Sequence, residues 1–142
     1  MNENLRNDLW ELFPDLIFFD HPVNDTSIVG LALLNDDGPS WCIVYDEGLV
    51  LNDLVKEFDD EIDAIEWYNF NTAGSYCGSA TPLFIHDNED NDFPASRIGS
   101  EITQYFSLND VKNFEHALSL VEDQSSFLFV KLNQLDEIKN LV

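Results

Sequence analysis

Basic residues are scarce in this chain. Lys and Arg together number 6 in 142 residues, against 28 Asp and Glu, and the formal net charge is −22. A folded domain with this charge repels nucleic acid and anionic membranes, because both are themselves negative. The composition therefore excludes direct binding to nucleic acid or to a membrane surface, and it favours a partner protein with a basic surface.

Cysteines and long apolar runs are also few. The two cysteines, Cys42 and Cys77, do not form a CxxC pair, and no other spacing indicates a metal site or a disulfide framework. No apolar run approaches the roughly 18 residues that a membrane span needs. The opening residues MNENLRNDLW lack the basic and apolar segments of a signal peptide. We expect a cytoplasmic protein with reduced thiols and no cofactor.

Motifs for catalysis are missing as well. The chain has no phosphate-binding Gly-rich loop, no GxSxG and no HExxH. Its three histidines, His21, His86 and His116, are far apart in the sequence. Cys77 and His86 lack the third group that would orient a nucleophile and its base. The sequence does not predict an enzyme, and an enzyme of unrecognised type is kept only as a third alternative.

A calcium site is not predicted either. Asp87, Glu89 and Asn91 imitate the first, third and fifth positions of a calcium-binding loop. The sixth position is Asp92, where a Gly is required, and the twelfth is Ile98, where a bidentate Glu is required. The loop is therefore acidic without being an EF-hand, and we assign no metal ligands.

Apolar residues, in contrast, are plentiful. They make up 44% of the chain and include 11 Phe, which distinguishes it from a disordered acidic tail. The length suits one domain with a sizeable core. Runs of predicted strands and helices alternate without a linker or an internal repeat. We predict a single α+β domain over residues 1–142, with an antiparallel sheet packed against several helices.

The N-terminal third predicts a helix followed by three strands. Apolar residues recur at helical spacing over 3–13 and stop at Pro14. Short apolar runs at 16–20, 27–34 and 41–46 are separated by turn-rich segments. We expect these runs to form a three-stranded antiparallel meander.

Two helices are expected next. Asp46 is placed to cap the first, which carries apolar residues at helical spacing up to Phe58. The second is expected over 61–71 and ends in the region of Gly74. Its inward-facing residues are expected to be Ile62, Ile65 and either Tyr68 or Asn69.

The C-terminal half alternates strands and helices. Ser107 and Asp110 have the spacing of a capping box, ahead of an apolar stripe from Val111 to Val121. Strands are expected at 81–86, 101–108 and 125–132, and a last helix follows them.

Acidic residues concentrate immediately before an aromatic cluster. Residues 57–63 contain five acids, and Trp67, Tyr68 and Phe70 follow, which we expect to lie mainly in the core. If 59–71 is helical, Asp59, Asp63 and Glu66 share one face, with the isoleucines on the other. A row of carboxylates on a rigid helix can stand in for a phosphate backbone. The simpler alternative is a solvated face that only keeps the protein soluble.

A second acid-rich segment follows the expected strand at 81–86. Because the two acidic segments flank this strand, we expect them to be displayed together on one side of the fold. The candidate partner-binding residues are Asp59, Asp60, Asp63, Glu66, Asp87, Glu89, Asp90 and Asp92.

Three stretches carry a resemblance to known sequences. They are SIVGLA, VYDEGLVLNDL and DAIEWYNFNTAGSYCGSATPLF, the last with an A-x-E-aromatic-aromatic pattern followed by Asn71, Gly74, Gly78 and Thr81-Pro82. Over roughly residues 17–86 the chain resembles a family of small uncharacterised proteins from phages and mobile elements. The resemblance implies a mobile-element context and no particular chemistry. The motif itself fits a helix end, tight turns and the entry to a strand.

These features favour an interaction protein. The first hypothesis is an acidic inhibitor that mimics nucleic acid and blocks a DNA- or RNA-binding defence protein, such as a restriction or CRISPR effector. The alternative is an immunity protein or antitoxin that covers the basic active site of a nuclease toxin. A homodimer would extend the charged surface in either case.

Overall fold

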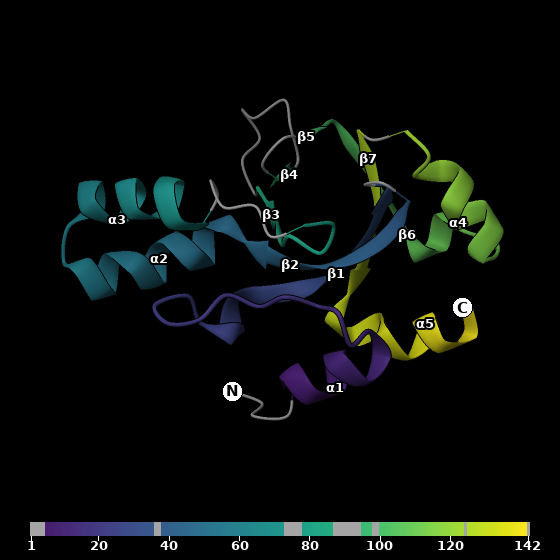
Figure 1. The fold of residues 1–142 in the computed structure, drawn as a ribbon, viewed down its shortest axis with the longest axis horizontal. Helices are drawn as coiled ribbons and strands as arrows, with labels where there is room; N and C mark the ends of the chain where they lie inside the picture. The colour runs from purple at the N-terminus through teal and green to yellow at the C-terminus, as the bar shows by residue number, and fades with distance from the viewer. Residues whose placement is uncertain are drawn as a thin grey trace.

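The fold is organised around a curled, seven-stranded mixed sheet (Figure 1). The structure is a computed structural model that describes residues 5–35, 38–72, 78–86, 95–97, 100–123 and 125–141. The strand order is β5-β4-β3-β2-β1-β7-β6. The strands are β1 (Ile28–Asn35), β2 (Pro39–Asp46), β3 (Leu83–Ile85), β4 (Ala95–Arg97), β5 (Ser100–Ile102), β6 (Gln104–Ser107) and β7 (Ser126–Lys131).

The α+β class is confirmed, but the expectation of a purely antiparallel sheet is wrong. β2 pairs parallel with β3, and β6 pairs parallel with β7. In both cases helical segments connect the two strands. A helical crossover brings the chain back to the starting edge of the sheet, so the second strand runs parallel to the first. As a result β2, β3, β6 and β7 all run in one direction, opposite to β1.

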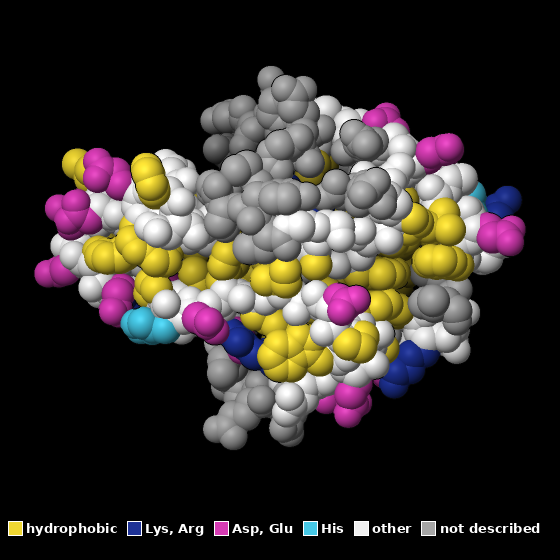
Figure 2. Space-filling view, viewed as in Figure 1, with side chains coloured by type: hydrophobic (Ala, Val, Ile, Leu, Met, Phe, Trp, Pro, Cys, Tyr) yellow, Lys and Arg dark blue, Asp and Glu magenta, His cyan; other side chains and the backbone are white. Residues whose placement is uncertain are grey.

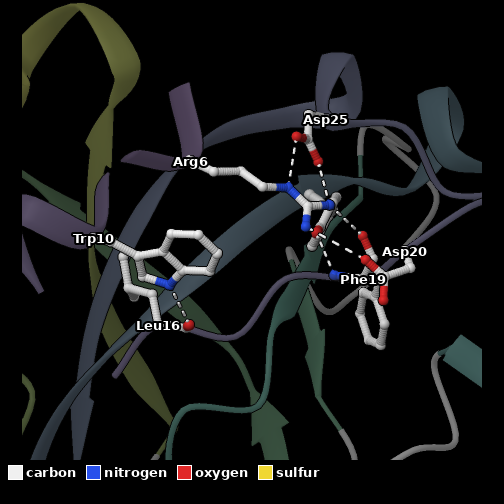
Figure 3. Close-up of polar contacts among 7 residues, drawn as sticks. Arg6, Trp10, Leu16, Phe19, Asp20 and Asp25 are labelled. Carbon is white, nitrogen blue, oxygen red and sulfur yellow. Dashed lines mark hydrogen bonds and ion pairs between the residues drawn. The ribbon is translucent and has the colours of Figure 1, made fainter. Parts of the chain in front are cut away.

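The expected meander is wrong in its first strand. The central strand β1 pairs with β2 on one side and with β7 on the other, so residues 16–20 are not part of the sheet. Side chains satisfy the backbone of this segment instead. Trp10 Nε1 donates to the Leu16 carbonyl at 2.9 Å, and the Phe19 N–H donates to the Tyr45 hydroxyl at 2.8 Å (Figure 3). These bonds satisfy part of the backbone that a neighbouring strand would otherwise bond.

The helices all pack on one face of the sheet. Leu31 and Leu33 of β1 face a core that receives buried residues from every helix, for example Leu9 and Ile138. Figure 1 shows α1 and α5 beneath the sheet, α4 at one end and α2 with α3 at the other. The helices are α1 (Leu5–Leu12), α2 (Glu47–Phe58), α3 (Glu61–Trp67), α4 (Phe114–Leu120) and α5 (Leu135–Leu141).

The other face of the sheet, which we call the opposite face, buries a second cluster drawn from strands. Alternate residues of β1 point to it, namely Ala32 and Leu34, and Phe127 and Phe129 join them from β7. Ile102 of β5 belongs to the same cluster, although four strands lie between β5 and β7 in the sheet order. A single residue separates β5 from β6, which pairs with β7, so the curl of the sheet brings its two edges together.

Most of the local expectations are confirmed. The capping box is present, with Asp110 Oδ2 accepting from the Ser107 N–H at 3.0 Å, although the turn that it caps is a short 3₁₀ helix. The expected strand at 101–108 is divided into β5 and β6 at Thr103. Gly78, in the resemblance motif, forms a tight turn with φ of 92°. Among the described residues, none of the helices combines the length and apolar character that a membrane crossing requires.

Candidate interaction surface

Helices α2 and α3 form a hairpin whose two-residue link is built from aspartates. Asp46 begins α2, because its Oδ1 accepts from the Leu49 N–H at 3.1 Å. Asp59 ends α2 in the left-handed conformation, with φ of 55°. Asp60 begins α3 by accepting from the Ile62 and Asp63 N–H groups at 2.8 and 3.3 Å. Side-chain caps at both helix starts and a left-handed residue between them fix the turn.

The rotation of α3 differs from the expected one. Ala64 and Tyr68 are the buried residues of this segment, and Trp67 packs on Phe58 of α2 with ring centroids 5.8 Å apart. The small Ala64 side chain suits a close approach of two helices joined by so short a link. The expectation that Ile62 and Ile65 face inward is therefore wrong.

The outer face of α3 carries large apolar side chains in solvent. Ile62 is 68% exposed and Ile65 is 41% exposed. Phe70 is 86% exposed and lies in the π-helical turn Tyr68–Thr72 that follows α3. The expectation of a buried aromatic cluster is thus confirmed for Tyr68 and wrong for Phe70. We define the α3 surface as the exposed side chains Glu61, Ile62, Asp63, Ile65, Glu66 and Phe70.

Hydrophobic and acidic side chains alternate at this end of the molecule. In Figure 2 the end formed by α2 and α3 shows yellow and magenta atoms interleaved. The segment 46–72 contains nine acids and a single cation, Lys56. Among the described residues, Glu61, Asp63 and Glu66 have no ion-pair partner. Their charges are therefore available to a partner protein.

The eight candidate acids are not equivalent. Asp59, Asp60, Asp63 and Glu66 are all exposed, as expected. However, Asp59 lies outside α3, so the expected helical row of Asp59, Asp63 and Glu66 is wrong at its first member. Asp60 is already engaged as the cap of α3. Asp63 and Glu66 are the two of these four that lie on α3, where no contact among the described residues engages their carboxylates. The other four, Asp87, Glu89, Asp90 and Asp92, lie outside the described residues.

A partly buried polar network ties the hairpin to the sheet. The Tyr68 hydroxyl donates to Glu47 Oε2 at 2.8 Å, and His86 Nδ1 lies 3.1 Å from Glu47 Oε1. Burial raises the pKa of the Glu47 carboxyl, but the contacts with His86 and Tyr68 outweigh it and hold that pKa below its ordinary value. Burial and the neighbouring Glu47 carboxylate hold the pKa of Tyr68 well above its ordinary value. The network makes the hairpin a firm support for the α3 surface.

Metal ligands are not assembled in the part of the chain that the structure describes. No group of three or more His, Cys, Asp or Glu side chains is arranged there to hold an ion. His21 contacts Glu57 at 3.1 Å, and His116 Nδ1 accepts from the Lys112 N–H. These histidines have local partners rather than a shared site.

The apolar members of the α3 surface were missed by the sequence analysis, although a signal exists. Glu61 and Asp63 flank Ile62, and Glu66 follows Ile65 directly. Neighbours in a helix are about 100° apart, so an isoleucine between acids cannot be far from their face. Periodicity alone favoured inward isoleucines. The flanking acids favour the orientation that the structure has.

Comparison with known protein families, with curated proteins and with solved structures gives no match to this chain.

Proposed function

We propose that this protein is an inhibitor that binds the basic surface of a nucleic-acid-binding protein and occupies the place of the nucleic acid. The observation that carries the proposal is the α3 surface, where Glu61, Asp63 and Glu66 project into solvent on one short helix. Proteins that bind phosphates recognise chiefly their charge and position. Carboxylates held on a rigid support offer both. The target class is a defence protein such as a restriction or CRISPR effector.

The exposed apolar residues define the contact further. Phe70 and Ile62 lie among the acids, and both would lose water on binding. Buried aromatic anchors supply much of the binding energy in protein interfaces, while the charged rim steers association and sets orientation. The partner should therefore present an apolar hollow bordered by Lys or Arg. Charge would bring the two proteins together, and Phe70 would slow their separation.

A second candidate is favoured by the same apolar residues. A phosphate mimic needs no apolar anchor, whereas an immunity protein that recognises one cognate nuclease toxin gains specificity from it. The exposure of Phe70 therefore also supports an antitoxin that covers a basic nuclease active site. The two candidates share the surface and differ in the identity of the target.

Affinity capture followed by mass spectrometry separates the candidates. The tagged protein is incubated with lysate from its host, and captured proteins are identified. A restriction or CRISPR effector supports the first candidate, and a nuclease toxin supports the second. Nucleic acid is then added in increasing amounts. Both candidates require that it displaces the inhibitor, and a complex that persists alongside bound nucleic acid would contradict both.

The role of the α3 surface is tested with matched charge reversals. Asp63→Lys with Glu66→Lys changes the α3 surface, whereas Glu11→Lys with Glu122→Lys makes the same charge change at exposed positions on α1 and after α4. Asp59 and Asp60 are left intact because they shape the link. We expect the first variant to lose inhibition and the second to keep most of it. Equal losses would mean that net charge, rather than this surface, is responsible.

A further inference from the structure

The carboxyl ends of β2, β3 and β7 line one groove. β2, β3, β6 and β7 run in one direction, and their ends therefore lie at one edge of the sheet. A groove of about 740 Å³ opens there, within the size range of small-ligand sites. Concave sites of this kind are a common place for ligands, because side chains from several strands meet there. The lining residues are Val29, Asp46, Ile85, His86, Tyr105, Phe129, Lys131, Leu132 and Asn133.

Strand alternation explains why this groove is apolar inside and charged at its end. Cys42 and Val44 point to the opposite face of the sheet, and Asp46 continues the same alternation at the end of β2. On β7, Phe127 and Phe129 point to the opposite face, and Lys131 continues their alternation at the end of the strand. A carboxylate and an ammonium group thus follow directly upon the apolar cluster.

An exposed aromatic ring forms one wall. Tyr105 is 47% exposed, and its ring stacks on Phe127 with centroids 5.5 Å apart. It also meets Phe129 edge-on, at 5.9 Å. Both partners are buried, so the ring is held by the core while part of it stays open to solvent. A flat or branched apolar group of a ligand can pack there.

The histidine of the groove is oriented from behind. Its Nδ1 lies 3.1 Å from Glu47 Oε1, and Glu47 is in turn bonded by Tyr68. The nearby carboxylate restrains the ring on its Nδ1 side, and Nε2 is the nitrogen left for a ligand. Within the described part of the chain, Nε2 of His86 has no hydrogen bond. The side chain is 9% exposed, so its position is set by the fold rather than by solvent.

We propose that this groove binds a small zwitterion with an apolar body, such as a free amino acid with an aliphatic or aromatic side chain. Lys131 would pair with the ligand carboxylate, and Asp46 with its ammonium group. One oxygen of Asp46 caps α2, which leaves the second for this role. The net charge of −22 disfavours a ligand that is negative overall, and Lys131 disfavours one that is positive overall. The proposal does not depend on the α3 surface.

The test is a titration followed by amide chemical shifts in two-dimensional nuclear magnetic resonance spectra. L-Phenylalanine is compared with phenethylamine, which lacks the carboxylate, and with 3-phenylpropionate, which lacks the ammonium group. We expect saturable shifts at Asp46, Tyr105 and Lys131. Each analogue should bind about tenfold more weakly than the amino acid, because one charge-assisted contact is lost.

Lys131→Met should abolish the preference for L-phenylalanine over phenethylamine, while Lys112→Met, at another exposed position, should preserve it. The unperturbed spectra of both variants report whether they are folded. Tyr105→Ala provides a second measurement, and it should weaken the binding of all three compounds by a similar factor. Equal affinity for the three compounds, shifts centred elsewhere or an absence of saturable binding at millimolar concentration would overturn the proposal.

Discussion

The Arg6 guanidinium binds both oxygens of the Asp25 carboxylate, with Nε 2.7 Å from Oδ2 and Nη2 2.9 Å from Oδ1 (Figure 3). Arg6 is on α1, and Asp25 begins the 3₁₀ turn Asp25–Ser27 that leads into β1, so the pair fastens the first helix to the entry of the sheet. The same guanidinium donates to the Phe19 carbonyl at 2.9 Å and lies over the Phe18 ring at 4.9 Å. A bidentate pair of this kind fixes orientation as well as distance.

We expect Asp25→Asn to lower the free energy of unfolding by about 2 kcal/mol, since it leaves a partly buried guanidinium without its charged acceptor. The Asp25 side chain is 11% exposed. The matched control is Asp20→Asn, because the Asp20 carboxylate is 90% exposed and lies 3.4 Å from Arg6. Its effect should stay within a few tenths of a kcal/mol. Urea denaturation measures both, and equal effects would contradict the assigned geometry.

Tyr68 and Phe70 provide a second matched pair. Tyr68 is 4% exposed and Phe70 is 86% exposed, although they are two residues apart. We expect Tyr68→Ala to destabilise the protein by about 3 kcal/mol, as large core truncations do. Phe70→Ala should change stability by less than about 0.5 kcal/mol. Thermal denaturation of the two variants tests this, and a large loss for Phe70→Ala would mean that its ring is packed rather than displayed.

The sequence predicted features that depend on near neighbours. The Asp46 cap, the helix α2 that follows it and the strand β7 are each determined by residues a few positions apart. The parallel pairing of β2 with β3 was missed, because it depends on how two intervening helices return the chain. The segment 16–20 was mistaken for a strand, since its backbone bonds to the side chains of Trp10 and Tyr45, which an apolar run does not reveal.

The charged residues of the candidate site were predicted from the sequence, whereas its exposed apolar residues were not. The exposure of Asp63 and Glu66 follows from their type, because ionised groups resist burial. The exposure of Ile62 depends on the rotation of α3. That rotation is set by Ala64 against α2 and by the bond from Tyr68 to Glu47, two contacts that periodicity does not contain.

The Glu47 network makes part of the stability dependent on pH. Its pKa is lower in the folded protein than its ordinary value of 4.5, so its stabilising contribution is present above that value and is lost as the pH falls through the folded-state pKa. We expect Glu47→Gln to destabilise by about 1 kcal/mol at neutral pH. The difference between the two proteins should shrink below pH 4.5. The wild type and the variant share all the other acids, so the difference between their free energies of unfolding in urea isolates the contribution of Glu47. A difference that stays constant with pH would contradict the network.

The buried tyrosines should resist ionisation. Burial raises the pKa of Tyr45 and of Tyr68 well above the ordinary value of 10.0, and the Glu47 carboxylate raises that of Tyr68 further. Their contribution to stability is therefore complete below pH 10 and is lost as the pH rises towards the folded-state values. In an ultraviolet titration, at most two of the 4 tyrosines should ionise before the protein unfolds. Tyr45→Phe and Tyr68→Phe should leave the ultraviolet titration curve of the folded protein unchanged. The loss of a reversible tyrosine ionisation in either variant would contradict this.

The salt dependence of partner binding should separate the two components of the α3 surface. Association driven by carboxylates weakens as salt rises, because ions screen the charges and counterion release contributes less. Apolar contact by Phe70, in contrast, changes little with salt. We expect Phe70→Ala to reduce affinity by a similar factor at every salt concentration, whereas Asp63→Asn with Glu66→Gln should flatten the slope of affinity against salt. Calorimetry with the captured partner measures both. A slope that is unchanged by removing the two charges would place the electrostatic contact elsewhere on the protein, and an unchanged affinity for Phe70→Ala would exclude its ring from the interface.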